Sequence, residues 1–205
     1  MIYIKDNFLH KNLLNSFNAD VEDFKEVKFP DKSFWVKELI PEVIERLCSK
    51  LSVIEGHRVE NVLSFIREAK KGQDDDWRIH NDSIINGTQP DRAIVLYLSE
   101  DDNEGLNGTA FWSHKKYGDT YTGDGVEEFN KVLKEDSNDS SKWDLKSIIG
   151  HKQNRLISYP CEYFHSKYPN EFINSRRVLV MFYKTNKQWN QKEKVDQIYM
   201  TRKSM

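Results

Sequence analysis

The sequence has few of the features that mark secreted, membrane-bound or nucleic-acid-binding proteins. Its 205 residues contain only two cysteines, Cys48 and Cys161, which cannot build a disulfide framework and favour a reducing compartment. No uninterrupted apolar run approaches the roughly 20 residues of a membrane-spanning helix. Residues 1–6 lack the basic segment and apolar core of a signal peptide. We therefore expect a cytoplasmic protein without a membrane partner.

The sequence also lacks an excess of either charge. Its 31 Lys and Arg residues stand against 33 Asp and Glu residues, for a formal net charge of −2. A chain without a basic excess gives no electrostatic footprint for a phosphate backbone, so we expect no nucleic-acid partner. What the sequence does have is 11 Phe, 9 Tyr and 5 Trp, enough bulky apolar material for the core of a globular domain. The oligomeric state is left open by these features.

Apolar spacing predicts helices near the N-terminus and strands in most of the remaining chain. Residues 41–55 have a helical period that Pro41 opens and Gly56 ends, and residues 11–17 are closer to helical than to extended spacing. Later apolar runs of strand length lie at residues 93–98, 109–112, 156–159 and 178–183. The pattern predicts a mostly β fold with N-terminal helices, in the form of a barrel or sandwich.

No internal repeat or linker divides the sequence into separate units. We predict one domain over residues 1–185, followed by a charged C-terminal tail at residues 186–205. Residues 118–147 are rich in Gly, Asp, Ser and Asn, and they contain one predicted helix, residues 126–134. This segment interrupts the β framework as an insertion, and we expect it to cover the entrance of a functional site.

Three residues form a candidate metal site. His80 and Asp82 stand two positions apart, and side chains with this spacing face the same side of an extended strand. A histidine and a carboxylate are two of the three ligands in the facial triad that binds non-haem iron(II). His165, which follows the apolar run 156–159 and a turn, is the candidate for the third ligand. A hydrogen-bonded pair at a strand end is the alternative interpretation of His80 and Asp82.

An arginine follows the candidate ligands at the start of the last apolar strand. The triad leaves three positions open on the ion, two of them for a 2-oxo acid and one for O2. The far carboxylate of 2-oxoglutarate then needs a bidentate donor, which arginine supplies best. Arg177 is the candidate for this donor, and Arg176 is the alternative. Tyr97 is either a second contact to the cosubstrate or a residue of the core.

These motifs resemble those of the 2-oxoglutarate/iron(II)-dependent oxygenases, in the prolyl-4-hydroxylase-like branch. The likeness extends over most of residues 2–183. It rests on His80-x-Asp82, on residues 97–99 (Tyr-Leu-Ser, where relatives often have Tyr-Leu-Asn) and on residues 107–112 (Asn-Gly-Thr-Ala-Phe-Trp, similar to their Gly-Gly-Thr-Ala-Phe turn).

A narrower likeness is to a poorly characterised bacterial and phage group. It rests on the order Trp143, residues 154–160 (Asn-Arg-Leu-Ile-Ser-Tyr-Pro) and Phe164-His165. The group also has an arginine with an aromatic residue five positions later. Arg177 fits this spacing through Phe182, whereas Arg176 would place Met181 there, so Arg177 is preferred.

The resemblance implies a double-stranded β-helix, which is a jelly-roll or cupin-like barrel. It also implies a dioxygenase that uses Fe(II), 2-oxoglutarate and O2, with His80, Asp82 and His165 as the metal ligands and catalytic centre. Arg177 and Tyr97 are the implied cosubstrate contacts. The implied reaction hydroxylates a peptidyl side chain, an amino acid or a small metabolite and releases succinate and CO2. The alternative is a catalytically silent or differently acting metal-binding β-barrel that serves as a binding module.

Overall fold

In the part of the chain that the computed structural model describes, strands hold more residues than helices do. The described residues are 1–19, 24–29, 32–70, 78–82, 85, 87–100, 108–121, 126–168 and 175–186. The helices are α1 (Lys11–Ala19), α2 (Pro41–Glu55) and α3 (Val126–Glu135), with a 3-10 turn η1 (Ser140–Lys142). The strands are β1 (Tyr3–Lys5), β2 (Lys25–Phe29), β3 (Lys32–Glu38), β4 (Arg58–Ala69), β5 (Arg92–Tyr97), β6 (Gly108–His114), β7 (Trp143–Ile149), β8 (Leu156–Pro160), β9 (His165–Tyr168) and β10 (Arg176–Asn186).

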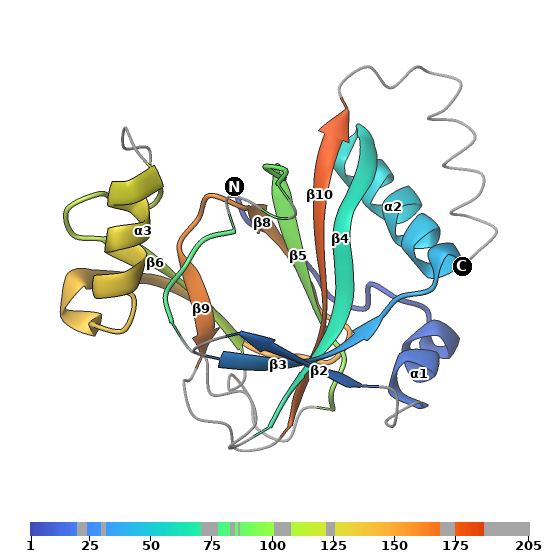
Figure 1. Cartoon of the computed structure of the whole chain (residues 1–205). Coiled ribbons are helices and arrows are strands. Elements are labelled where there is room, and N and C mark those ends of the chain that lie inside the picture. Colours follow the sequence, from blue (N-terminus) through green and yellow to red (C-terminus); the bar gives the residue numbers. More distant parts are fainter. Residues whose placement is uncertain are drawn as a thin grey trace.

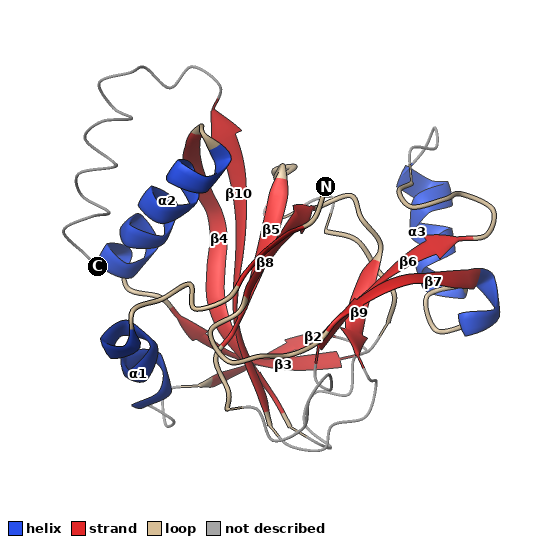
Figure 2. Ribbon diagram, turned by 180° about the vertical axis from the view of Figure 1, so that it is seen from behind, coloured by secondary structure: helices blue, strands red, loops and turns tan. Residues whose placement is uncertain are grey.

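The strands form two antiparallel sheets. The major sheet has seven strands in the order β1-β8-β5-β10-β4-β3-β2, and the minor sheet has three strands in the order β7-β6-β9. Figures 1 and 2 show the major sheet curving round to face the minor sheet, so that the two enclose a common interior. Helices α1 and α2 lie outside the major sheet, while α3 lies beside the minor sheet (Figure 1).

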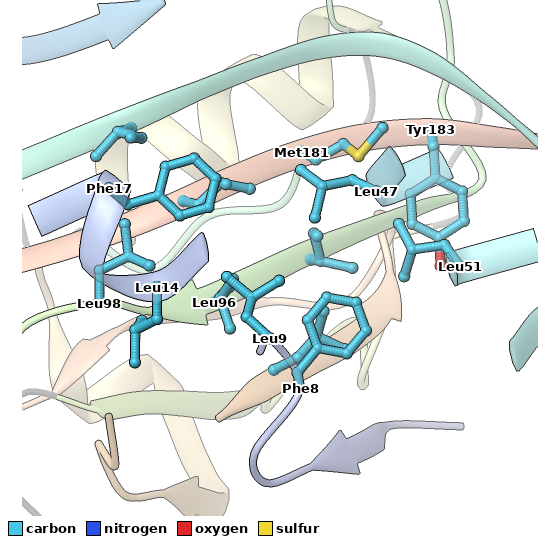
Figure 3. Packing of buried hydrophobic residues seen from close by; sticks show 14 of the residues in the cluster. Phe8, Leu9, Leu14, Phe17, Leu47, Leu51, Leu96, Leu98, Met181 and Tyr183 are labelled. Atoms are coloured by element: carbon cyan, nitrogen blue, oxygen red, sulfur yellow. The ribbon is translucent and has the colours of Figure 1, made fainter. Parts of the chain in front are cut away.

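The outer face of the major sheet is covered by α1 and α2. Helix α2 has Pro41 at its first turn, where a missing N–H costs nothing, and ends at Gly56, whose φ of 69° is readily adopted only by glycine. Its buried residues Leu47 and Leu51 pack onto the sheet, and each contributes roughly 1.5–3 kcal/mol of apolar burial. Figure 3 shows these two side chains beside those of β5 and β10. We call this face the helix-facing side.

Alternation along each strand sends every second side chain to the opposite face, into the barrel interior. On β10, the residues in the helix-facing cluster are Leu179, Met181 and Tyr183. The interior cluster takes its neighbours on the same strand, Val178, Val180 and Phe182. Strand β5 divides in the same way, with Ile94 and Leu96 toward the helices and Ala93, Val95 and Tyr97 toward the interior. The sequence position of a residue on β5 or β10 therefore fixes which face it serves.

The mostly β prediction is confirmed, but its placement of the helices is incomplete. Helices α1, α2 and the predicted helix of the polar insertion are all present, and the last, α3, lies in the middle of the chain. The helices are therefore not specifically N-terminal. Strand β7 also begins within residues 118–147 and pairs along β6, so that part of this segment belongs to the minor sheet. None of the described helices has the length and apolar character needed to cross a membrane.

Candidate metal centre

The fold brings the three candidate ligands together through backbone hydrogen bonds. The N–H of His80 donates to the carbonyl of His165 at 3.0 Å, and the N–H of His165 returns the bond to His80 at 2.8 Å. The N–H of Asp82 donates to the carbonyl of Cys161 at 2.9 Å. These bonds fix the segment that carries the first two ligands against β9 and the turn before it. Residues 85 positions apart in sequence are thus neighbours, as the triad hypothesis requires.

The donor atoms of the three side chains converge on one point. One ligand atom from each of His80, Asp82 and His165 lies within 4.8 Å of the others. The Nε2 atom of His165 is 3.3 Å from one carboxylate oxygen of Asp82, and the Nε2 atom of His80 is 3.9 Å from the other. Two imidazoles and one carboxylate form the donor set that suits a non-haem Fe(II) ion, so the residues present fit this metal.

Hydrogen bonds orient both imidazoles for metal binding. The Nδ1 atom of His80 is 2.8 Å from the carbonyl oxygen of Arg78, and the Nδ1 atom of His165 is 3.0 Å from that of Tyr163. A carbonyl oxygen only accepts, so Nδ1 carries a proton in each ring, and Nε2 is the nitrogen left to coordinate a metal. Each Nε2 atom lies near the Asp82 carboxylate.

Burial keeps His165 in the form that binds a metal. Loss of solvent lowers the pKa of His165 from 6.5 to about 4, and the neighbouring His80 adds to this effect while the Asp82 carboxylate opposes it. The ring is consequently neutral at neutral pH. A neutral imidazole and an ionised carboxylate need lose no proton before they coordinate a cation.

The two adjacent arginines of β10 serve opposite faces of the major sheet. Arg177 lies on the helix-facing side, where its Nη2 atom is 2.8 Å from Oε1 of Glu68 and its guanidinium lies 5.2 Å from the ring centre of Phe24. Arg176 is buried on the interior side, with its guanidinium 5.6 Å from the ring centre of Tyr97. The structure therefore does not bring Arg177 to the three candidate ligands.

The physical reason is strand alternation. Phe182, the aromatic residue used to choose between the two arginines, lies in the interior cluster. Residues that share a face of a strand are separated by an even number of positions, which holds for Arg176 and Phe182. Arg177 is separated from Phe182 by five positions and must point the other way. The interior arginine is the residue that the sequence interpretation kept as its alternative.

Tyr97 lies in the interior wall beside Arg176. Its side chain is completely buried, and its hydroxyl is 2.8 Å from Oγ1 of Thr109 on β6. Arg176 also donates to the carbonyl oxygen of Gly108, at 3.4 Å. Gly108 must be glycine, because a Cβ there would collide with the carbonyl oxygen of Ile149 on β7. This close approach explains the glycine in the Asn-Gly-Thr-Ala-Phe-Trp motif.

A residue to which the sequence interpretation gave no role in the site contacts one of the candidate ligands. The hydroxyl of Tyr159, on the interior face of β8, is 3.2 Å from Nε2 of His165. Its ring is 2% exposed and meets Phe111 edge-on, with ring centres 5.1 Å apart. Burial, reinforced by the Asp82 carboxylate, raises the pKa of Tyr159 well above its usual value. Tyr159 lies two positions after Ile157, an interior residue of the same strand. This even spacing was the sequence signal that Tyr159 also faces the interior.

Comparisons with known proteins place this geometry in context. No family model matches the sequence, and no curated protein matches it. Solved structures do match. The HygX protein of Streptomyces hygroscopicus, crystallised with nickel and 2-oxoglutarate bound, has a TM-score of 0.62 and 11% identity over 92% of this chain and 85% of its own. The chain shares its fold.

Two further structures have the same fold. A prolyl-4-hydroxylase from Pseudomonas putida has a TM-score of 0.53 and 14% identity over 90% of this chain and 92% of its own. SnoK, a non-haem α-ketoglutarate-dependent carbocyclase from nogalamycin biosynthesis, has a TM-score of 0.63 and 12% identity over 91% of this chain and 83% of its own. At these identities the similarity establishes the architecture, while the chemistry must be argued from this chain's own side chains.

Proposed function

We propose that this protein is an Fe(II)- and 2-oxoglutarate-dependent dioxygenase with the double-stranded β-helix fold. The observation that carries the proposal is the convergence of donor atoms from His80, Asp82 and His165 within 4.8 Å, inside an architecture shared with such oxygenases. When bound, Fe(II) and 2-oxoglutarate supply the activation of O2, with succinate and CO2 as co-products. The three side chains would hold the ion, which would supply a binding site for the 2-oxo acid and O2.

The interior arginine is the better candidate to bind the far carboxylate of 2-oxoglutarate. Arg176 is 6% exposed and lies in the same wall as Tyr97, whereas Arg177 is engaged by Glu68 on the other face. A buried guanidinium gives a carboxylate two charge-assisted hydrogen bonds in a water-poor setting. We therefore assign the carboxylate contact to Arg176 and retain Tyr97, through its hydroxyl, as a second contact.

The substrate is proposed as a small molecule or a peptidyl side chain. HygX has been crystallised with hygromycin B bound, and other proteins of this fold are a prolyl-4-hydroxylase and a carbocyclase. The architecture thus serves both substrate classes, with hydroxylation as the outcome we propose here. We further propose that residues 1–185 act as one catalytic domain and that part of residues 118–147 lies at the substrate entrance.

The proposal is tested by titrating the purified apoprotein with Fe(II) and then with 2-oxoglutarate, without oxygen. Chelation of Fe(II) by the 2-oxo acid produces a visible charge-transfer band, and we expect this band in the natural protein and its loss in His165→Ala. Succinate formation on admitting O2 is the second readout. Iron binding without a band would favour a different metal-dependent barrel, and failure to bind iron would favour a catalytically silent binding module.

A further inference from the structure

Tyr159 occupies a position that metal binding must disturb. Because Nδ1 of His165 carries the ring proton, its Nε2 atom is an acceptor, and the Tyr159 hydroxyl 3.2 Å away is the donor. The lone pair that accepts this hydrogen bond is the same lone pair that a metal ion requires. Binding of an ion to His165 and donation by Tyr159 to the same atom are therefore mutually exclusive.

The surroundings of Tyr159 make loss of that hydrogen bond costly unless another acceptor takes its place. The side chain is 2% exposed, and its ring lies against Phe111 in the interior cluster of apolar residues. A buried hydroxyl without a partner is unfavourable in such an environment. A hydroxyl released by His165 therefore needs another acceptor, such as an oxygen or nitrogen atom that arrives with the ion.

The position of the hydroxyl indicates which arriving atom this is. Tyr159 stands on β8, directly paired with Ala93 of β5, on the interior wall that also carries Tyr97 and Arg176. This is the wall to which we assign the cosubstrate, so the hydroxyl that contacts His165 belongs to the same wall as the carboxylate contact. A 2-oxo acid presents anionic carboxylate and keto oxygens to the ion, and each is a strong acceptor.

We propose that the Tyr159 hydroxyl is a positioning group that donates a hydrogen bond to a metal-bound oxygen of 2-oxoglutarate. This inference rests on the proposed function, because it requires the 2-oxo acid at the ion. In the metal-free protein the hydroxyl donates a hydrogen bond to Nε2 of His165 and so keeps the imidazole oriented. In the loaded protein it turns to the cosubstrate oxygen and favours one orientation of the chelate. The proposed site thus comprises Tyr159 as a positioning residue, besides the three metal ligands and Arg176.

The test compares Tyr159→Phe with Tyr183→Phe under anaerobic conditions. Tyr183 is the matched control, since it is also completely buried in the major sheet but donates to Glu55 on the helix-facing side. We measure the Kd for Fe(II) alone, and then the Kd for 2-oxoglutarate and the position of the charge-transfer band with Fe(II) present. Thermal unfolding of each apoprotein checks that the variants are folded.

We expect Tyr159→Phe to bind Fe(II) as tightly as the natural protein or a few-fold more tightly, because a competitor for Nε2 is removed. Its Kd for 2-oxoglutarate should rise by about tenfold or more, the loss typical of one hydrogen bond to a charged group. The band should also shift, while Tyr183→Phe should match the natural protein in all three measurements. Should Tyr159→Phe unfold, Tyr159→Met removes the same hydroxyl with an adaptable apolar side chain and is judged by the same constants.

Two results would overturn the inference without touching the proposed function. An unchanged Kd for 2-oxoglutarate in Tyr159→Phe, with the band present, would show that the hydroxyl does not contact the chelate. Weaker Fe(II) binding with an unchanged 2-oxoglutarate Kd would show that Tyr159 only supports His165. Absence of the band in the natural protein would instead overturn the proposed function and remove the basis for this inference.

Discussion

The two faces of the major sheet use their polar side chains differently. On the helix-facing side, Glu68 accepts from both Arg177 and Lys70, at 2.8 Å each, so the carboxylate is matched by cations of the protein itself. On the interior side, Asp82 faces the imidazoles of His80 and His165. On one face the carboxylate is paired with cations of the protein, whereas the other face gathers the donor atoms to which we assign a metal ion. Arg176 and Arg177, although adjacent on β10, therefore face different sets of polar side chains.

This contrast also separates stability from binding. Burial alone would raise the pKa of Glu68, but its hydrogen bonds to Lys70 and Arg177 outweigh that effect, so the pKa is lowered. Such a carboxylate stabilises the fold in its ionised form. The Asp82 carboxylate instead faces two imidazoles, in the donor set to which we assign the metal ion. The following predictions test this division.

The largest expected effect is on metal binding. Asp82→Ala and His165→Ala each remove a proposed ligand, and we expect the Kd for Fe(II) to rise by at least about 100-fold. Substituting a residue that only hydrogen-bonds to a ligand typically raises the Kd for the metal by less than this. Glu68→Gln, on the opposite face, should leave this Kd within threefold. Anaerobic equilibrium titration measures all three variants. Tight Fe(II) binding by Asp82→Ala would remove Asp82 from the ligand set.

The second expected effect separates the two arginines. Arg176→Leu should raise the Kd of the Fe(II) protein for 2-oxoglutarate by about 100-fold, as expected when a buried charge loses its partner. Arg177→Leu should change that Kd by less than threefold, since its guanidinium points toward the helices. The charge-transfer band is the readout. The opposite ranking would mean that Arg177 reaches the cosubstrate and that the face assignment is wrong.

The third prediction concerns the pH dependence of apoprotein stability. The pKa of His165 is about 4 in the fold against 6.5 for an unperturbed histidine, so between these pH values the unfolded chain binds a proton that the folded chain does not. The free energy of unfolding should therefore decrease as the pH falls from 6.5 to 4, by up to about 3 kcal/mol. Urea unfolding with a chelator present measures this.

The control for that experiment is His165→Gln, which retains the other titrating groups. As the pH is lowered from 6.5 to 4, we expect the free energy of unfolding to fall more in the natural protein than in this variant. A constant difference from pH 7 to pH 4 would show that His165 titrates normally.

The smallest expected effects come from the same substitution on the two faces. Glu68→Gln should lower the free energy of unfolding by about 2–3 kcal/mol, because Arg177 loses a buried partner. Asp82→Asn should leave it unchanged or raise it by about 1 kcal/mol, because it removes a largely buried charge. Arg177→Met combined with Glu68→Leu should recover most of the loss. Equal destabilisation by both amide substitutions would remove the proposed difference between the faces.

The sequence was most informative where one physical pattern acted alone. The helical period and the terminal Pro41 and Gly56 predicted α2 with its observed limits, 41–55. The uniformly apolar run 93–98 predicted β5, whose two faces are both buried. Strand β7 was missed because five of its seven residues are exposed, and so its apolar residues do not mark an inward face.

The candidate ligands could be predicted, but their neighbours could not. The two-residue spacing of His80 and Asp82 predicts that their side chains share one side of a strand, and the position of His165 after an apolar strand and a turn made it the candidate for the third ligand. The choice between Arg176 and Arg177 depended on which face of β10 points inward, which a fixed spacing to an aromatic residue does not reveal. Tyr159 resembled an ordinary core tyrosine, and its hydroxyl gains meaning only beside His165.

The paired backbone hydrogen bonds between His80 and His165 have a consequence for how the proposed metal would be acquired. Since peptide groups already join the two ligand-bearing segments, the chain can complete its fold before an ion arrives. On the proposed function, the ion would then be captured by a folded protein, and the available metals and the Irving–Williams order would bear directly on which metal is loaded. Whether a tighter-binding divalent ion takes the place of Fe(II) would therefore depend on the concentrations of the available metals, because the folded protein binds the ion after folding is complete.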